Sequence, residues 1–133
     1  MRYCADTWFI LAVFAKEAHA IALIEETKRG KTRIIIPVIV YAEATKKLMQ
    51  KGIPLDIIEE FFEGVEASEK IELVLIDKLI AQEAAKVSLT FHVPLIDSLV
   101  ASTTKLTGYD VLLSGDTDYE NLVKRKYLKV FSW

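Results

Sequence analysis

Short apolar runs alternate with longer segments of helical period along almost the whole chain. Runs rich in β-branched residues predict strands, whereas apolar residues that recur every three or four positions predict helices. The predicted strands are 2–5, 33–36, 71–76, 111–114 and 128–133. The predicted helices are 7–14, 17–29, 37–51, 55–65, 78–91 and 94–106, with a short turn or helix at 116–122.

Several residues that start or stop helices mark the boundaries of these elements. Gly30 and Gly108 are placed to end helices, because glycine adopts the left-handed conformation that follows a helix C-terminus. Pro37 suits the first turn of a helix, and Pro94 separates two helical segments. Asp77 is placed to cap the helix that it precedes. The alternation of strand and helix therefore has clear boundaries.

The order of these elements predicts a fold class. Strands separated by helices pair in parallel through right-handed crossovers, and the helices then cover both faces of the sheet. We therefore predict a three-layer α/β/α domain with a central parallel sheet. The length of 133 residues fits one domain spanning 1–133, and the 52% hydrophobic content with a mean hydropathy of +0.26 provides a substantial core. No apolar stretch reaches the roughly 18 residues of a membrane helix, so we expect no membrane association.

Charge and cysteine content restrict the function classes further. A formal net charge of -2 and a pI near 5.7 argue against binding nucleic acid through overall positive charge, so such contacts must be local or mediated by metal. Cys4 is the only cysteine, which excludes an internal disulfide and a cysteine-based zinc site. The run at 8–15 loosely imitates a signal peptide, but Asp6 and Lys16 interrupt that pattern. We therefore expect a cytoplasmic protein.

Five acidic residues stand where apolar runs end or helices begin: Asp6, Glu43, Asp97, Asp116 and Asp118. Asp6 and Asp116 follow predicted strands, at the carboxyl ends where open parallel sheets bind ligands. Glu43 and Asp97 lie in the first turns of predicted helices, so these four can meet at one rim. Gathered carboxylates repel one another unless a cation is bound, so the pattern predicts a metal site. Oxygen ligands without His or Cys suit Mg²⁺ or Mn²⁺ and disfavour zinc.

Each carboxylate also has an ordinary structural interpretation. Asp6 is placed to cap a helix, and Glu43 precedes Lys47 by the spacing of a surface ion pair. Asp97 near a helix start favours the helix dipole, and aspartate is common in glycine-containing turns such as 115–118. Carboxylates that acted only as separate caps and turn residues would not be expected to lie at positions that one α/β topology brings to the same rim. We therefore expect a shared site.

The ordered set of these motifs resembles the PIN domain family, and within it the compact single-domain toxins of VapC type. The pieces that carry the resemblance are Asp6-Thr7 after the first strand, the helical Glu43, the helical Asp97, and the turn Ser114-Gly115-Asp116-Thr117-Asp118-Tyr119. Ser114 stands where the family more often has Thr, and Tyr119 stands where Phe is common. Both substitutions keep the hydroxyl or the aromatic ring, and the set covers nearly the whole chain.

The resemblance implies an endoribonuclease that hydrolyses RNA phosphodiester bonds with one or two Mg²⁺ or Mn²⁺ ions. It implies that Thr7 and Ser114 orient the ligands through their hydroxyls. It also implies a cognate antitoxin partner and a homodimer. The implied catalytic residues are Asp6, Glu43, Asp97 and Asp116, and the implied metal ligands are these four together with Asp118.

Basic residues around the acidic rim are candidates for RNA contact. Lys46 and Lys47 lie on the helix that carries Glu43, and Lys16 follows the first helix. A solvated helix face is an equally weighted alternative for these lysines. The cluster 124–126 is a weaker candidate, because it is also placed to protect the last strand from edge pairing.

Other function classes remain open beside the toxin. One is a module of the same fold whose site is chemically idle and only binds RNA or protein, and another is an RNA-processing PIN nuclease without a toxin role. Processing relatives often add a zinc ribbon, which one cysteine cannot supply, so the toxin is favoured. A metal-dependent phosphatase is disfavoured, because Thr7 and Trp8 follow Asp6 where such enzymes carry a second aspartate nearby.

Overall fold

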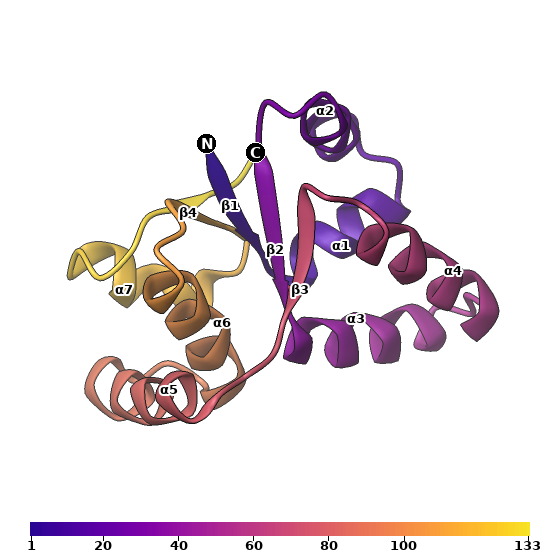
Figure 1. The fold of residues 1–133 in the computed structure, drawn as a ribbon. Helices are drawn as coiled ribbons and strands as arrows, with labels where there is room; N and C mark the ends of the chain where they lie inside the picture. Colours follow the sequence, from indigo (N-terminus) through magenta and orange to yellow (C-terminus); the bar gives the residue numbers. More distant parts are fainter.

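A parallel sheet of five strands forms the centre of the structure, a computed structural model that describes residues 1–133 (Figure 1). The strand order is β3-β2-β1-β4-β5, and all four pairings are parallel. The strands are β1 (Arg2–Ala5), β2 (Arg33–Pro37), β3 (Ile71–Val74), β4 (Val111–Leu113) and β5 (Val130–Phe131). Figure 1 shows β1, β2 and β3 running downward, so their carboxyl ends lie at the lower edge of the sheet.

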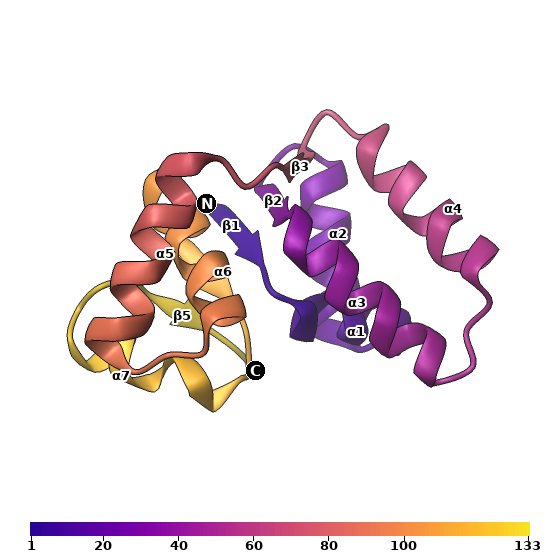
Figure 2. The ribbon, with the colours of Figure 1, turned by 90° about the horizontal axis from the view of Figure 1, so that it is seen from below.

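Two groups of helices flank this sheet. Helices α1 to α4 lie on one side of it and α5 to α7 on the other, as both views show (Figures 1 and 2). The predicted three-layer α/β/α architecture is therefore confirmed. The helices are α1 (Thr7–Phe14), α2 (Ala18–Lys28), α3 (Val38–Gln50), α4 (Leu55–Glu66), α5 (Lys78–Phe91), α6 (Leu95–Leu106) and α7 (Glu120–Lys124), with a 3₁₀ turn at Thr117–Tyr119.

The central strands β1 and β4 are buried, as expected for a parallel sheet covered on both faces. Cys4, Ala5, Leu112 and Leu113 are fully buried in the core. Burial raises the pKa of the Cys4 thiol to about 12, so this cysteine is a small core hydrophobe rather than a reactive group. The carboxyl ends of these two adjacent strands lie side by side, and the residues that follow them must meet.

The outer strands are shorter than the sequence predicts. β3 ends at Val74 rather than Ile76, because its partner β2 ends at Pro37, which pairs with Val74. Beyond that pair no neighbouring strand remains, and Leu75 is exposed. β5 covers Val130–Phe131 rather than 128–133, because β4 offers it a partner strand of only three residues.

Helix ends follow the predicted signals. The Asp77 carboxylate accepts a hydrogen bond of 2.8 Å from the Ile80 amide and caps α5. Gly30 has a φ of 79° after α2. α5 ends at Phe91, and its C-cap His92 adopts a left-handed φ of 58°. Pro94 then precedes α6, so it separates the two helices as predicted. By length and composition no single helix of the chain qualifies as a membrane span, although two sharply bent helix pairs do.

Candidate metal centre

The ends of β1 and β4 bring Asp6 and Asp116 together through one hydroxyl. The Asp6 amide donates to the Leu113 carbonyl (3.2 Å), which sets the two strand ends in register. The Ser114 hydroxyl donates to the Asp6 carboxylate (2.7 Å) and accepts from the Asp116 amide (3.0 Å). Ser114 and Asp6 are both buried, at 1% and 3% exposure. Ser114 therefore joins the two strand ends from within the core.

Asp6 occupies the N-cap position of α1 but does not cap it with its side chain. The carboxylate makes no cap hydrogen bond and accepts from Ser114 instead. The neighbouring Thr7 hydroxyl is buried and has no hydrogen-bond partner. A buried hydroxyl without a partner costs free energy, so it remains available to a group bound beside Asp6.

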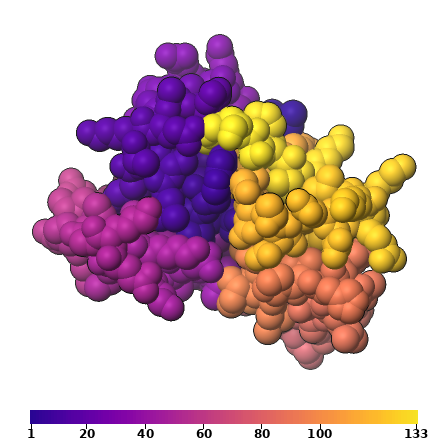
Figure 3. Space-filling view, turned by 180° about the vertical axis from the view of Figure 1, so that it is seen from behind, coloured from indigo at the N-terminus to yellow at the C-terminus, as the bar shows by residue number.

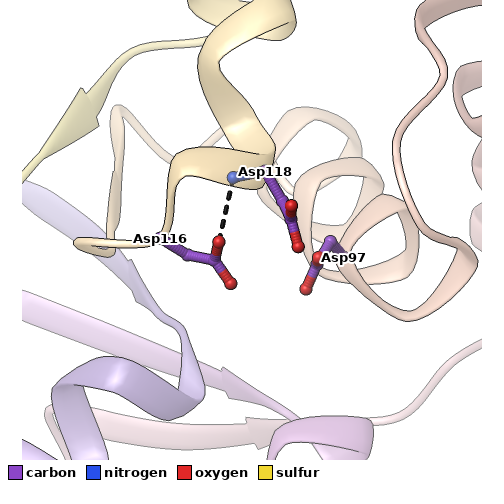
Figure 4. Close-up of side chains that lie close together, drawn as sticks. All are labelled: Asp97, Asp116 and Asp118. Carbon is purple, nitrogen blue, oxygen red and sulfur yellow. Dashed lines mark hydrogen bonds between the residues drawn. The ribbon is translucent and has the colours of Figure 1, made fainter.

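Three aspartates from two segments converge at the same edge (Figure 4). Asp97 comes from the first turn of α6, and Asp116 and Asp118 come from the turn that follows β4. Ligand oxygens of the three carboxylates all lie within 4.8 Å of one another. The Asp118 amide donates to the Asp116 carboxylate (2.9 Å), which fixes the turn. Their side chains point into a common space, so they form the centre of the candidate site.

Asp6 and Glu43 lie beside this group of three rather than within it. Glu43 lies in the second turn of α3 rather than in the first turn that the sequence predicts. It is half-buried, and its charge contributes to the raised pKa of Asp6. No ion pair joins Glu43 to Lys47, so the surface-pair interpretation of Glu43 is wrong. Asp6 in turn contributes to the raised pKa of Asp97. The five predicted carboxylates therefore lie close enough to influence one another's protonation.

Burial and mutual repulsion determine the protonation of this site. Burial is the largest cause of the raised pKa of Asp6, and the charges of Glu43 and Asp116 add to it. Burial likewise raises the pKa of Asp97 to about 7, and the neighbouring Asp118 carboxyl favours its protonated form further. The buried Tyr119 hydroxyl lies 3.4 Å from Asp97, to which it donates, and its own pKa is raised by burial.

The donor set fits a hard divalent cation. Carboxylate and hydroxyl oxygens line the site, and no histidine or cysteine joins them, because His19 and His92 are exposed elsewhere and Cys4 is buried. A bound cation would relieve the repulsion that raises these pKa values. Asp97, Asp116 and Asp118 are placed to share one ion.

The basic residues predicted to contact RNA are exposed but do not touch the carboxylates. Lys46 and Lys47 lie one turn beyond Glu43 on α3, and Lys16 follows α1 with a left-handed φ of 57°. None of the three forms an ion pair with a carboxylate. Their contact with RNA stays a prediction.

The sequence did not reveal how the turn at Asp116 is held in place. A Cβ atom on Gly115 would lie 2.4 Å from Nε1 of Trp8, so only glycine fits against this indole ring. Trp133 packs on Trp8 with ring centroids 4.8 Å apart and on His19 at 5.5 Å. The single glycine beside Asp116 was the only available signal, and it does not indicate which residue packs there.

The raised pKa of Asp97 predicts how the stability of the metal-free protein depends on pH. The folded state holds this proton up to about pH 7, whereas the unfolded chain releases it near pH 3.8. Stability must therefore fall as pH rises between these values, because the unfolded state there binds fewer protons. Asp97→Asn, which keeps the shape and carries no charge, should remove this contribution.

Urea unfolding of wild type and Asp97→Asn in EDTA, from pH 4 to pH 8, measures this effect as the difference between the two proteins. The stability of the variant relative to wild type should increase with pH and level off above about pH 7. A difference that does not change with pH would contradict the raised pKa.

The fold and the cluster together define a class: three-layer α/β proteins whose carboxylates at one end of a parallel sheet can hold a divalent cation. A family model described as PIN domain matches residues 3–125. The chain therefore belongs to the PIN domain family. Comparison with curated proteins gives no match.

Solved structures share the fold at low sequence identity. VapBC2 from Rickettsia felis, bound to a DNA fragment from its promoter, matches with a TM-score of 0.76 at 16% identity and covers 100% of this chain and 99% of that one. VapC20 from Mycobacterium tuberculosis, described as a sarcin-ricin loop cleaving toxin, gives 0.71 at 14%, covering 89% and 92%. A toxin-antitoxin complex from Klebsiella pneumoniae gives 0.68 at 14%, covering 88% and 89%.

Proposed function

We propose that this protein is a metal-dependent endoribonuclease that acts as the toxin of a toxin-antitoxin pair. The observation that carries the proposal is the convergence of Asp97, Asp116 and Asp118 within 4.8 Å, at the sheet edge of a PIN domain. Carboxylates gathered this closely destabilise the metal-free protein, because each raises the cost of ionising the next. Binding cations and phosphates at this edge explains them.

The carboxylates of this site have different proposed roles. Asp97, Asp116 and Asp118 hold the principal cation, and Asp6 adds negative charge from the end of β1. Glu43 on α3, together with Asp97, provides the position for a second cation. A bound Mg²⁺ or Mn²⁺ would neutralise charge on the scissile phosphate and make a water molecule acidic enough to attack it.

Hydroxyl groups keep these carboxylates in place. Ser114 fixes one oxygen of Asp6, and Tyr119 fixes one oxygen of Asp97. Each carboxylate then has its other oxygen free to face a cation. Thr7, buried and without a partner beside Asp6, supplies a further oxygen at the edge of the site.

RNA and an antitoxin are proposed as partners because proteins of the same fold have them. The similar protein from Mycobacterium tuberculosis is described as cleaving the sarcin-ricin loop, and the similar structure from Klebsiella pneumoniae is a toxin-antitoxin complex. For this chain we propose an RNA substrate, inhibition by a cognate antitoxin, a homodimer and a cytoplasmic location.

An RNA cleavage assay tests the reaction. Structured and unstructured RNAs are incubated with the protein in Mg²⁺, in Mn²⁺ or in EDTA, with duplex DNA as a comparison substrate. We expect cleavage of RNA in either metal, none in EDTA, and little cleavage of duplex DNA. Equal cleavage in EDTA would overturn the metal mechanism, and no cleavage in any condition would favour the idle binding module.

Expression in bacterial cells separates the toxin from an RNA-processing nuclease. Induction of the protein alone should slow growth, and the matched Asp116→Asn variant should not. Soluble, nucleolytically active protein that leaves growth unchanged would exclude the toxin role for that host and would leave the nuclease activity standing.

A further inference from the structure

The C-terminal part of the chain is strongly basic, although the chain as a whole is acidic. Residues 121–133 carry four cationic side chains and no acidic one, in a chain of net charge -2. Figure 3 shows this segment, in yellow, projecting from one face of the molecule. The four cations are Lys124, Arg125, Lys126 and Lys129.

Two clefts run along this segment and share a wall. One, of about 360 Å³, is lined by Ser114, Asp116, Glu120 and Lys124, and so reaches the candidate metal centre at Asp116. The other, of about 1030 Å³, includes Lys126 and Lys129. Val123 of α7 and Val130 of β5 line both clefts. The two clefts are therefore neighbours that share these walls. Together they are here named the β5 groove, which has Asp116 of the candidate metal centre at one end and a cluster of lysines at the other.

The far end of the β5 groove is cationic in its local charge balance. Lys105, Lys126 and Lys129 line it, and none of them forms an ion pair with a carboxylate. The single acidic residue there, Asp110, is already paired with Arg2 at 3.5 Å. Asp110 also accepts a hydrogen bond of 3.1 Å from the Arg2 amide, and these bonds from Arg2 lower the pKa of its carboxyl. The lysine charges are thus free to meet an external anion.

The groove suits a phosphate backbone better than bases. Its two partly buried tyrosines are already covered, since Arg2 lies over the Tyr109 ring at 5.4 Å and Lys105 over the Tyr127 ring at 5.2 Å. Stacking platforms for bases are therefore occupied, whereas the ammonium groups of Lys126 and Lys129 are exposed. Contacts between lysine ammonium groups and phosphates position a nucleic acid without recognising its sequence.

We propose that the β5 groove binds the phosphate backbone of the RNA on one side of the bond to be cut and leads it to the candidate metal centre. The proposal rests on the proposed nuclease function. In this arrangement the lysine end attracts the strand, and the aspartate end becomes compatible with phosphate only once a cation is bound. The groove thus adds affinity for RNA that extends beyond the cleavage site.

RNA binding by a double variant, Lys126→Gln/Lys129→Gln, tests this proposal. The probe is a fluorescently labelled single-stranded RNA, and its affinity is measured by anisotropy at several salt concentrations in EDTA, where we expect no cleavage. The control is Lys31→Gln/Lys78→Gln, which removes the same charge from exposed positions that form no ion pair and lie outside the groove. Lys105 is left unchanged, because its ammonium group donates to the Tyr127 carbonyl (2.9 Å).

We expect the groove variant to bind RNA roughly tenfold more weakly than the control. The slope of log affinity against log salt concentration should also be shallower by about 1.4, because each of the two lost phosphate contacts contributes about 0.7 to that slope. Its stabilisation by Mn²⁺ in a thermal melt should match that of wild type. Affinity and slope equal to those of the control would overturn the groove and leave the nuclease intact. The proposal would also be overturned if the double substitution changed the molecular mass of the protein in solution, and hence its oligomeric state, without changing its affinity for RNA. The groove would then be a protein interface.

Discussion

Replacing Asp6 with asparagine is expected to abolish metal-dependent RNA cleavage and yet leave the metal-free protein at least as stable as the wild type. Asp6 is 3% exposed, and its pKa is raised by burial and by the charges of Glu43 and Asp116. Two such charges 4 Å apart repel by about 4 kcal/mol at an effective dielectric near 20. The asparagine side chain would carry no charge, keep the shape of the aspartate, and still accept a hydrogen bond from Ser114.

The loss of activity should be large. Residues that merely orient metal ligands change activity by about 10- to 100-fold when they are replaced, so a carboxylate of the site itself should matter more than about 100-fold. The rise in melting temperature on adding Mn²⁺ should also shrink, because the variant binds the ion more weakly in its native state.

Thermal melts in EDTA and in Mn²⁺, together with a cleavage assay, measure both effects. Asp77→Asn is a matched control, because Asp77 also precedes a helix but does cap it, through a 2.8 Å bond from the Ile80 amide. Asparagine caps nearly as well as aspartate, so this control should lose little stability and respond normally to Mn²⁺. An Asp6→Asn variant that cleaves RNA at the wild-type rate and gains full stability from Mn²⁺ would remove Asp6 from the site.

The parts of the fold that the sequence predicted best are those set by local signals. The alternation of apolar runs and helical periods indicated the parallel sheet, because strand and helix periods differ strongly. Asp6 and Asp116 could be placed at one edge, since each follows a strand and parallel strands end at the same edge. Their direct link through Ser114 follows from the pairing of β1 with β4, which no local signal specifies.

The remaining details depend on contacts between distant segments. β3 ends where its partner β2 turns away, and β5 is short because β4 is short. The hydrogen bond between Tyr119 and Asp97 joins residues 22 positions apart in the chain. Residue types and spacings predict that a carboxylate lies at an edge, but not which ring or hydroxyl packs against it.

Gly115→Ala is expected to weaken both the fold and the metal centre, although alanine adds a single methyl group. The new Cβ would lie 2.4 Å from Nε1 and 2.6 Å from Cε2 of Trp8. Trp133 packs against Trp8 with centroids 4.8 Å apart, which limits how far the indole ring can move. The φ of Gly115 is not positive, so lack of space is the whole cause. Overpacking of this kind costs about 1–3 kcal/mol.

The same displacement should reach the metal centre, because Gly115 lies between Ser114 and Asp116. A shifted turn separates the Asp116 carboxylate from Asp97, so the Mn²⁺-induced rise in melting temperature and the cleavage rate should both fall. Gly64→Ala in α4 is the matched control, since its Cβ would meet nothing within 4 Å. That substitution should raise stability by about 0.5–1 kcal/mol, as alanine does in a helix interior.

Combining Gly115→Ala with Trp8→Phe separates this steric effect from a general loss of packing. The smaller ring should recover part of the stability that Gly115→Ala loses, so the double-mutant cycle should show a favourable coupling between the two positions. Additive losses would mean that the indole does not hold the turn. A Gly115→Ala protein with wild-type stability and an unchanged response to Mn²⁺ would show that the turn carrying Asp116 tolerates a side chain, and that Trp8 does not position the metal centre.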